Sequence, residues 1–108
     1  MVDYCGIYSG AKKDKSGVFK IFYGTAKDAP LIAECPVNLE CRVKHTVDME
    51  SHIVILGEII ETYVSESCLT NGKADTKKID PLIFSFPDGQ YWRIGEAIGR
   101  AFQLGKEK

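Results

Sequence analysis

The sequence predicts a mainly β protein with flanking helices, built as a small antiparallel barrel, closed or split. Residues 37–47 alternate strictly between apolar and polar side chains, which is typical of a strand with one covered face. After a turn at residues 48–51, an apolar run restarts at His52 and continues to Val64. The two segments therefore form one wide β-hairpin. A shorter hairpin is expected further on, because Asp88-Gly89 separates two β-prone segments with a tight turn.

The length and net charge of the chain are those of an ordinary folded domain. The chain has 108 residues, enough for one domain, which we place over residues 1–108. Its formal net charge of −1 gives no electrostatic reason to expect nucleic acid or an anionic membrane surface as a partner. No apolar run approaches the ~20 residues that span a bilayer. The first six residues lack the character of a signal peptide, so we expect a cytoplasmic protein.

Cysteine and histidine spacing argues against a metal site or a disulfide. Cys35 and Cys41 lie six residues apart on one strand, roughly 20 Å at ~3.3 Å per residue, too far for a disulfide. We expect the four cysteines to be reduced, as is usual in the cytoplasm. His45 and His52 do not have the spacing of a ligand pair, so no metal is predicted.

The first third of the chain predicts one helix and one short strand. A helix is expected over Ala11–Tyr23, where apolar side chains recur near helical spacing and lysines lie outside them. Leu31 and Ile32 follow a turn signal and predict a strand. The lysines are either a solvated helix face or part of an anion site. Lys15 adjoins a Ser-Gly turn and the expected helix start, a combination that suits a phosphate.

The second long strand is apolar on both of its faces. Residues 53–56, 59, 60, 63 and 64 are all apolar, so the second face needs a cover, for which another subunit is one candidate. Gly57 in mid-strand indicates a bulge or a barrel corner. His52, where this strand begins, is either a surface turn histidine or an imidazole at the mouth of a barrel.

The last third predicts a loop, a hairpin and a helix. Residues 65–80 are polar and loop-like, with a turn at Asn71-Gly72. Residues 81–87 and 90–94 are the two strands of the short hairpin. Gly95 to Phe102 are expected to form a short terminal helix. The sequence offers no set of nucleophile, base and orienting residue, so any chemistry should come from a cofactor.

At this point the chain resembles the flavin reductase-like family, and its flavoredoxin-type members in particular. The segments that carry the resemblance, in chain order, are Cys5-Gly6-Ile7-Tyr8-Ser9-Gly10 with Asp14-Lys15, Glu34 to Cys41, His52 to Glu58, Asp80-Pro81-Leu82-Ile83, and Tyr91-Trp92-Arg93-Ile94-Gly95. They cover nearly the whole chain in the family's order. The chain departs from the family pattern in having Glu50 where Gly is usual and Ser51 where Asp is usual.

The resemblance implies an FMN-binding split β-barrel that forms a homodimer with flavin at the subunit interface. Members reduce flavin or ferric chelates with NAD(P)H, or pass electrons to a carrier protein. By position, Lys15 beside Ser9 and Gly10 would meet the FMN phosphate or ribityl chain. His52 would lie near the isoalloxazine ring and the incoming donor, as the catalytic residue, and Phe86 would flank the ring.

The resemblance also implies that the chain corresponds to the C-terminal part of the family domain and lacks its N-terminal strands. Two functions follow as hypotheses. The first is an FMN-binding oxidoreductase or flavoredoxin-type electron transfer protein. The alternative is a truncated descendant that no longer binds FMN and acts as a dimeric structural or interaction module.

Overall fold

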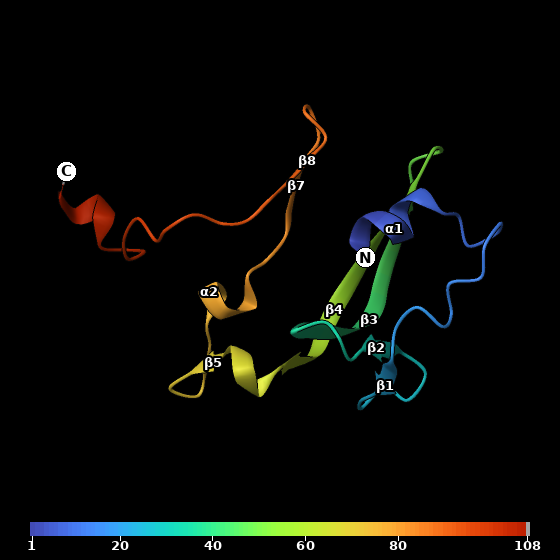
Figure 1. The fold of residues 1–108 in the computed structure, drawn as a ribbon, viewed down its shortest axis with the longest axis horizontal. Helices are drawn as coiled ribbons and strands as arrows, with labels where there is room; N and C mark the ends of the chain where they lie inside the picture. The colour runs from blue at the N-terminus through green and yellow to red at the C-terminus, as the bar shows by residue number, and fades with distance from the viewer. Residues whose placement is uncertain (108) are drawn as a thin grey trace. The chain divides into compact units, whose positions relative to one another are not determined.

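Paired antiparallel strands make up most of the regular structure in the computed structural model, which describes residues 1–107 (Figure 1). The strands are β1 Ile21–Tyr23, β2 Pro30–Ile32, β3 Val37–Asp48, β4 Ile53–Val64, β5 Leu69–Thr70, β6 Lys73–Ala74, β7 Ile83–Ser85 and β8 Gln90–Trp92. The helical elements are α1 Val2–Ile7, the 3-10 turn η1 Glu66–Cys68, α2 Thr76–Ile79 and the 3-10 turn η2 Leu104–Glu107. The strands pair as β1-β2, β3-β4, β5-β6 and β7-β8. The described residues form no closed barrel, and the mainly antiparallel prediction is confirmed.

The chain divides into two units, Met1–Glu66 and a second one that begins at Ser67. The first unit holds α1, β1-β2 and the long β3-β4 hairpin. The second holds the remaining strands and α2. No helix among residues 1–107 is long and apolar enough to cross a membrane.

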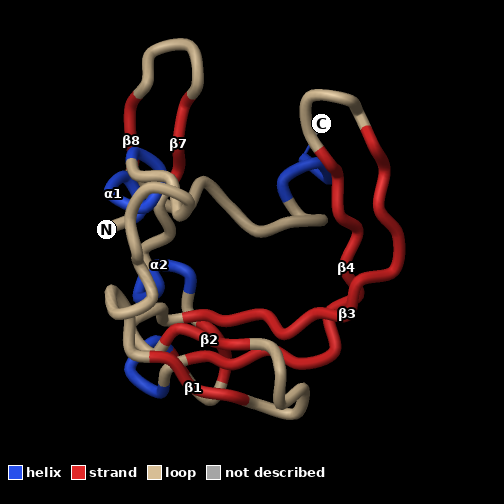
Figure 2. The backbone as a smooth tube through the Cα atoms, turned by 90° about the vertical axis from the view of Figure 1, so that its right-hand side faces the viewer, coloured by secondary structure: helices blue, strands red, loops and turns tan. Residues whose placement is uncertain are grey.

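The long β3-β4 hairpin is present as predicted, with its tip at residues 49–52. The backbone N–H of Met49 donates to the carbonyl of His52 at 2.9 Å and closes the turn. The pairing register shifts twice, between Glu40 and Cys41 and again between Val43 and His45. Figure 2 shows the two strands bending together near their middle, as bulges make them do. Gly57 pairs with Val43 at the second shift, so the predicted bulge is confirmed.

Within this chain, the covered part of β3 is not its apolar face. Glu40 is 1% exposed, whereas Leu39 and Val43 are 50% and 61% exposed. The alternation is real, but the expectation that it places the apolar side chains in the core is wrong for this unit. The physical reason is the β1-β2 hairpin, which covers the side of β3-β4 that carries Glu40, with the Phe22 ring edge-on to Tyr63 at 5.9 Å.

Polar side chains, not apolar ones, join β1-β2 to β3. The Asn38 amide accepts from the N–H of Ile32 at 2.9 Å and donates to the Ile32 carbonyl at 2.9 Å. It also donates to the carbonyl of Cys35 at 3.2 Å. Leu31, 5% exposed, is the buried apolar residue of this unit. The predicted strand at Leu31-Ile32 is thus confirmed, and its position is fixed by Asn38.

The helix expected over Ala11–Tyr23 is wrong. The chain turns at residues 10–13 and again near Gly17. The last three residues of this segment, Ile21–Tyr23, form β1. Glycine disfavours a helix interior by about 1 kcal/mol relative to alanine. Pairing of Ile21 with Ile32 in the sheet then overrides the local helical spacing. The N-terminal helix instead occupies Val2–Ile7, for which the sequence analysis predicted no element.

In the second unit, the loop expected at residues 65–80 contains regular structure. The turn at Asn71-Gly72 is confirmed, with φ of 52° and 74° as a tight hairpin turn requires, and it joins β5 to β6. The hairpin β7-β8 is also confirmed, although its strands are shorter than expected. The helix expected from Gly95 to Phe102 is wrong, because that segment has no helix and Phe102 has a φ of 63°.

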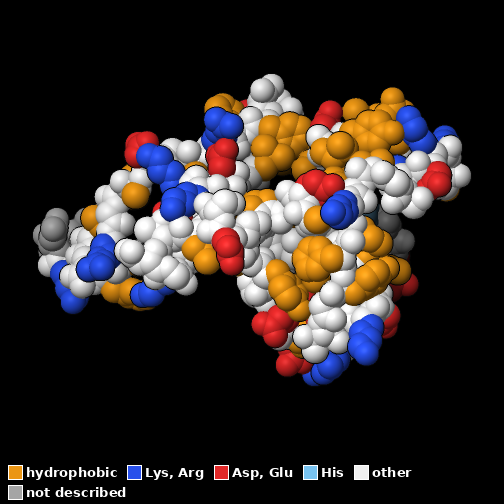
Figure 3. Space-filling view, turned by 60° about the horizontal axis from the view of Figure 1, so that its bottom comes forward, with side chains coloured by type: hydrophobic (Ala, Val, Ile, Leu, Met, Phe, Trp, Pro, Cys, Tyr) orange, Lys and Arg blue, Asp and Glu red, His pale blue; other side chains and the backbone are white. Residues whose placement is uncertain are grey.

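Large hydrophobic side chains remain exposed over much of the surface (Figure 3). On β4, the neighbouring residues Val54 and Ile55 are 46% and 62% exposed. Because successive side chains of a strand point to opposite faces, both faces of β4 are open here. Within the first unit, residues 1–66, the two-faced apolar strand therefore has no cover at these positions.

Candidate functional site

Three of the expected flavin contacts lie together in the loop that follows α1. Ser9 opens this loop, and its carbonyl accepts from the amides of Lys12 and Lys13, each at 3.0 Å. Its hydroxyl accepts from the N–H of Ala11 at 3.3 Å. Gly10 is the next residue, and an added Cβ there would meet only open space. Lys15 reaches back from the far side of the loop to α1.

The Lys15 ammonium donates to two backbone carbonyls, that of Cys5 at 2.9 Å and that of Tyr8 at 2.6 Å. It therefore lies at the C-terminal end of α1. The expectation that Lys15 adjoins helix N-terminal amides is wrong, because no helix begins in this loop. A lysine ammonium has three N–H donors. Two are used here, so one remains for an anion.

The charges around Lys15 are held by local contacts. The Asp14 carboxylate accepts from the backbone N–H of Ser16 at 2.9 Å. This bond, with a second from the Ser16 hydroxyl, holds the pKa of Asp14 below its ordinary value. Lys13 lies over the rings of Tyr4 and Tyr8, with its Nζ 5.1 and 4.3 Å from their centroids. The loop thus carries two placed ammonium groups and one carboxylate.

The sequence interpretation missed this tyrosine and lysine cluster. Tyr4 and Tyr8 are four residues apart, the spacing at which two side chains meet on a helix. Their rings lie 5.0 Å apart. The spacing of the two tyrosines was the available signal, but the sequence analysis predicted no helix before Ala11.

His52 stands at the tip of the β3-β4 hairpin, exposed to solvent. Its Nδ1 lies 3.0 Å from the hydroxyl of Ser51. The turn before it is held by the Asp48 carboxylate, which accepts from the N–H of Glu50 at 2.8 Å. Glu50 has a φ of 66°, a left-handed conformation that favours glycine. Figure 2 shows this tip well away from α1, so the unit does not bring His52 to Lys15.

Phe86 lies at the tip of the β7-β8 hairpin in the second unit and is 85% exposed. The indole N–H of Trp92 donates to the hydroxyl of Ser85 at 2.7 Å, and that hydroxyl donates to the carboxylate of Asp88. These contacts brace the hairpin and leave the Phe86 ring available for stacking on a planar ligand.

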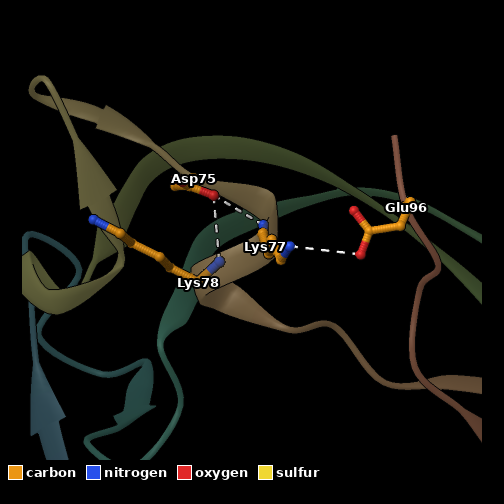
Figure 4. A network of polar contacts seen from close by, with 4 residues as sticks. All are labelled: Asp75, Lys77, Lys78 and Glu96. Atoms are coloured by element: carbon orange, nitrogen blue, oxygen red, sulfur yellow. Dashed lines mark hydrogen bonds and ion pairs between the residues drawn. The ribbon is translucent and has the colours of Figure 1, made fainter. Parts of the chain in front are cut away.

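A second polar network closes α2 in the same unit (Figure 4). Asp75 is the N-cap residue, and its carboxylate accepts from the backbone amides of Lys77 and Lys78. The hydroxyl of Thr70 donates to it at 2.6 Å and, with the two amides, lowers the pKa of Asp75. Lys77 pairs with Glu96 at 3.6 Å, but both side chains are more than 80% exposed. This network stabilises local structure and includes none of the expected site residues.

Two hollows open on the first unit. One of about 350 Å³ is lined by Met1, Tyr4 and Val18 and is mainly apolar. The other, of about 400 Å³, is lined by Ala26, Asp28, Ala29, Cys41, Arg42, Val43 and Ile60. Neither includes the expected flavin contacts. Within residues 1–107, no group of three or more metal-ligating side chains is gathered.

The chain is similar to two solved flavoredoxins. The crystal structure of flavoredoxin from Methanosarcina acetivorans matches with a TM-score of 0.92 and 50% identity, over 97% of this chain and 56% of that one. The flavoredoxin of Desulfovibrio vulgaris (Miyazaki F) matches with a TM-score of 0.83 and 38% identity, over 95% of this chain and 56% of that one. The chain thus spans about half the length of each.

Sequence comparison points to the same family as the two solved structures. An uncharacterized protein of Archaeoglobus fulgidus is 35% identical over 72 residues, which are 65% of this chain and 40% of that protein. The model of the flavin reductase like domain family matches residues 1–91. This range includes all five expected site residues. The arrangement of antiparallel strands is that of the flavoredoxin split barrel, and the chain belongs to the flavin reductase like domain family.

Proposed function

We propose that this chain works in flavin-dependent electron transfer and that FMN is its flavin. The observation that carries the proposal is the family match over residues 1–91, supported by the likeness to two flavoredoxins. We propose either a flavin reductase-like activity with NAD(P)H or a flavoredoxin-type exchange of electrons with a carrier protein. A bound flavin would supply the hydride and electron chemistry, as cofactors do.

The residues present suit the parts of FMN. Lys15 has one N–H donor left for the phosphate, beside the hydroxyl of Ser9 and the open backbone of Gly10. His52 is exposed at the hairpin tip, and its Nδ1 lies 3.0 Å from the hydroxyl of Ser51. We propose that His52 lies near the isoalloxazine ring and the incoming electron donor, as the catalytic residue. Phe86 offers an exposed aromatic face for stacking.

We propose that the working form is a homodimer. Both faces of β4 expose large apolar side chains in the single chain, among them Ile53 at 65% and Ile59 at 56%. A second copy is our choice of cover, because the family resemblance implies a dimer with flavin at the subunit interface. We also propose a cytoplasmic location, with the four free cysteines as support.

The second candidate is a family member that has lost FMN and serves as a dimeric interaction module. One observation favours it. The three groups of expected contacts, around Lys15, His52 and Phe86, lie in separate loops.

A titration of the purified protein with FMN, followed by visible absorption, decides between the two. Binding with a perturbed flavin spectrum supports the flavin protein, and the substitution Lys15→Ala should then weaken FMN much more than riboflavin, which lacks the phosphate. Equal losses for the two ligands would contradict the phosphate role. No binding at tens of micromolar FMN would contradict the flavin protein and favour the interaction module.

A further inference from the structure

Helix α1 ends without the features that usually close a helix. Its C-cap residue, Tyr8, is extended, with φ of −98° and ψ of 120°, where a left-handed glycine is common. The last turn contains no basic residue of its own. The final carbonyls of a helix have no partner inside it, so they must find donors elsewhere. At six residues, α1 is also too short to be stable alone.

Lys15 supplies what α1 lacks. Its half-buried ammonium donates to the carbonyls of Cys5 and Tyr8, at 2.9 and 2.6 Å. A cation at this end also suits the direction of the helix dipole. Lys13 adds a second positive charge, held over the rings of Tyr4 and Tyr8. The loop at residues 9–16 is therefore tied to α1 mainly by its lysines.

The same contacts fix the position of the Lys15 ammonium. A free lysine side chain samples many rotamers, and a ligand that immobilises it must overcome that entropy. Here two of its three donors are bound to the carbonyls of Cys5 and Tyr8, which leaves the third for a ligand. A group fixed before binding loses less entropy when the ligand arrives.

We infer that α1 is a positioning element for flavin binding: it holds the Lys15 ammonium ready, so α1 folding and phosphate binding strengthen each other. This inference rests on the proposed function, since it concerns the same lysine. It assigns a task to a helix that itself makes none of the proposed flavin contacts. Because coupling between two equilibria is reciprocal, flavin phosphate should also stabilise α1.

The first test breaks α1 without changing Lys15. In Cys5→Pro, the N–H that donates to the Met1 carbonyl at 3.1 Å is lost, and proline disrupts the turn. The matched control is Gly6→Ala, where the added Cβ meets open space and alanine favours the helix. Dissociation constants of FMN and riboflavin are measured for each protein.

Cys5→Pro should lower FMN affinity about tenfold more than riboflavin affinity, the effect expected for releasing one long side chain. Gly6→Ala should keep the ratio of the two affinities at or above that of the unsubstituted protein. If Cys5→Pro binds FMN with an unchanged ratio, the inference is overturned while the proposed function stands. If the unsubstituted protein binds neither flavin, both are overturned.

A second test needs no helix-breaking variant. Hydrogen exchange of the α1 amides is followed in the unsubstituted protein, alone and with each flavin. FMN should slow this exchange, and riboflavin at equal saturation should slow it less. Without ligand, Lys15→Met should speed exchange in α1, whereas Lys12→Met, an exposed lysine of the same loop, should not. Equal effects of the two lysine variants would overturn the inference, even in a protein that binds FMN.

Discussion

The backbone amide of Ala26 donates a hydrogen bond to Oε1 of Glu40, with the nitrogen and oxygen 2.7 Å apart. Glu40 is the most buried polar side chain of the described residues. On its other oxygen it accepts from the hydroxyl of Tyr63 at 3.5 Å, and that hydroxyl in turn accepts from the N–H of Thr25 at 3.3 Å. A buried carboxylate is tolerated here because it satisfies the loop after β1, whose amides would otherwise lack partners.

Gly24 should not tolerate a side chain. A Cβ at this position would lie 2.5 Å from Oε2 of Glu40 and would overlap the hydroxyl of Tyr63. We expect Gly24→Ala to lower the free energy of unfolding by about 1–3 kcal/mol, the usual effect of overpacking. Gly17→Ala is the control, because its Cβ would meet open space. Urea unfolding followed by circular dichroism measures both, and equal stabilities would contradict the crowding at Gly24.

Glu50 should be replaceable by glycine with a gain in stability. Its φ of 66° places a side chain in a backbone region that costs most L-residues about 1–2 kcal/mol. Part of this gain is offset by the greater freedom of glycine in the unfolded chain. We expect Glu50→Gly to raise the free energy of unfolding by about 0.5–1 kcal/mol. Glu50→Ala keeps the backbone cost, so a similar gain for alanine would point to charge instead.

The cap that the Asp75 carboxylate forms on α2 should weaken in acid. Its pKa is lowered below the ordinary 3.8, first by the hydroxyl of Thr70 and then by the amide of Lys78. A group with a depressed pKa stabilises the folded state above its unfolded pKa, and the stabilisation is lost as the pH falls through the folded value. The amide signals of α2 should therefore shift below about pH 4 in an NMR titration.

The matched variant for this titration is Thr70→Val. It removes the hydroxyl that donates to Asp75 and keeps a side chain of similar shape. The pKa of Asp75 should rise toward 3.8. If the carboxyl titrates at the same pH in both proteins, the Thr70 contact is not the main cause.

The exposed face of β4 should hold two chains together. Ile55 is 62% exposed, and a lysine in its place would put charge into an apolar interface. In sedimentation velocity, we expect the unsubstituted protein to run as a dimer and Ile55→Lys as a monomer. Glu58→Gln, on the same strand, removes the ion pair with Lys44 at 2.7 Å but leaves the apolar side chains. It should remain a dimer, and a monomeric unsubstituted protein would remove the case for this interface.

The family match includes residues that the fold alone would not single out. The motif around Ser9 and Lys15 could be found in the sequence because residue identity and order carry it. The contact of Lys15 with α1 could not be found in this way, because the sequence analysis did not predict α1. Six residues with no N-cap side-chain bond and no glycine at the end give little local signal. One of their carbonyls, that of Cys5, is met by a lysine ten residues away.

The sequence by itself determined the β3-β4 and β7-β8 hairpins, the turn at Asn71-Gly72 and the bulge at Gly57. Alternation, Asn-Gly and Asp-Gly turns and Gly57 act over a few residues, and such signals are not changed by distant contacts. Only the tertiary structure decided which face of β3 is covered and where Lys15 points. Alternation tells the two faces of a strand apart, but it does not say which one the β1-β2 hairpin will meet. Here it meets Glu40, because the loop amides after β1 need a carboxylate more than they need another apolar side chain.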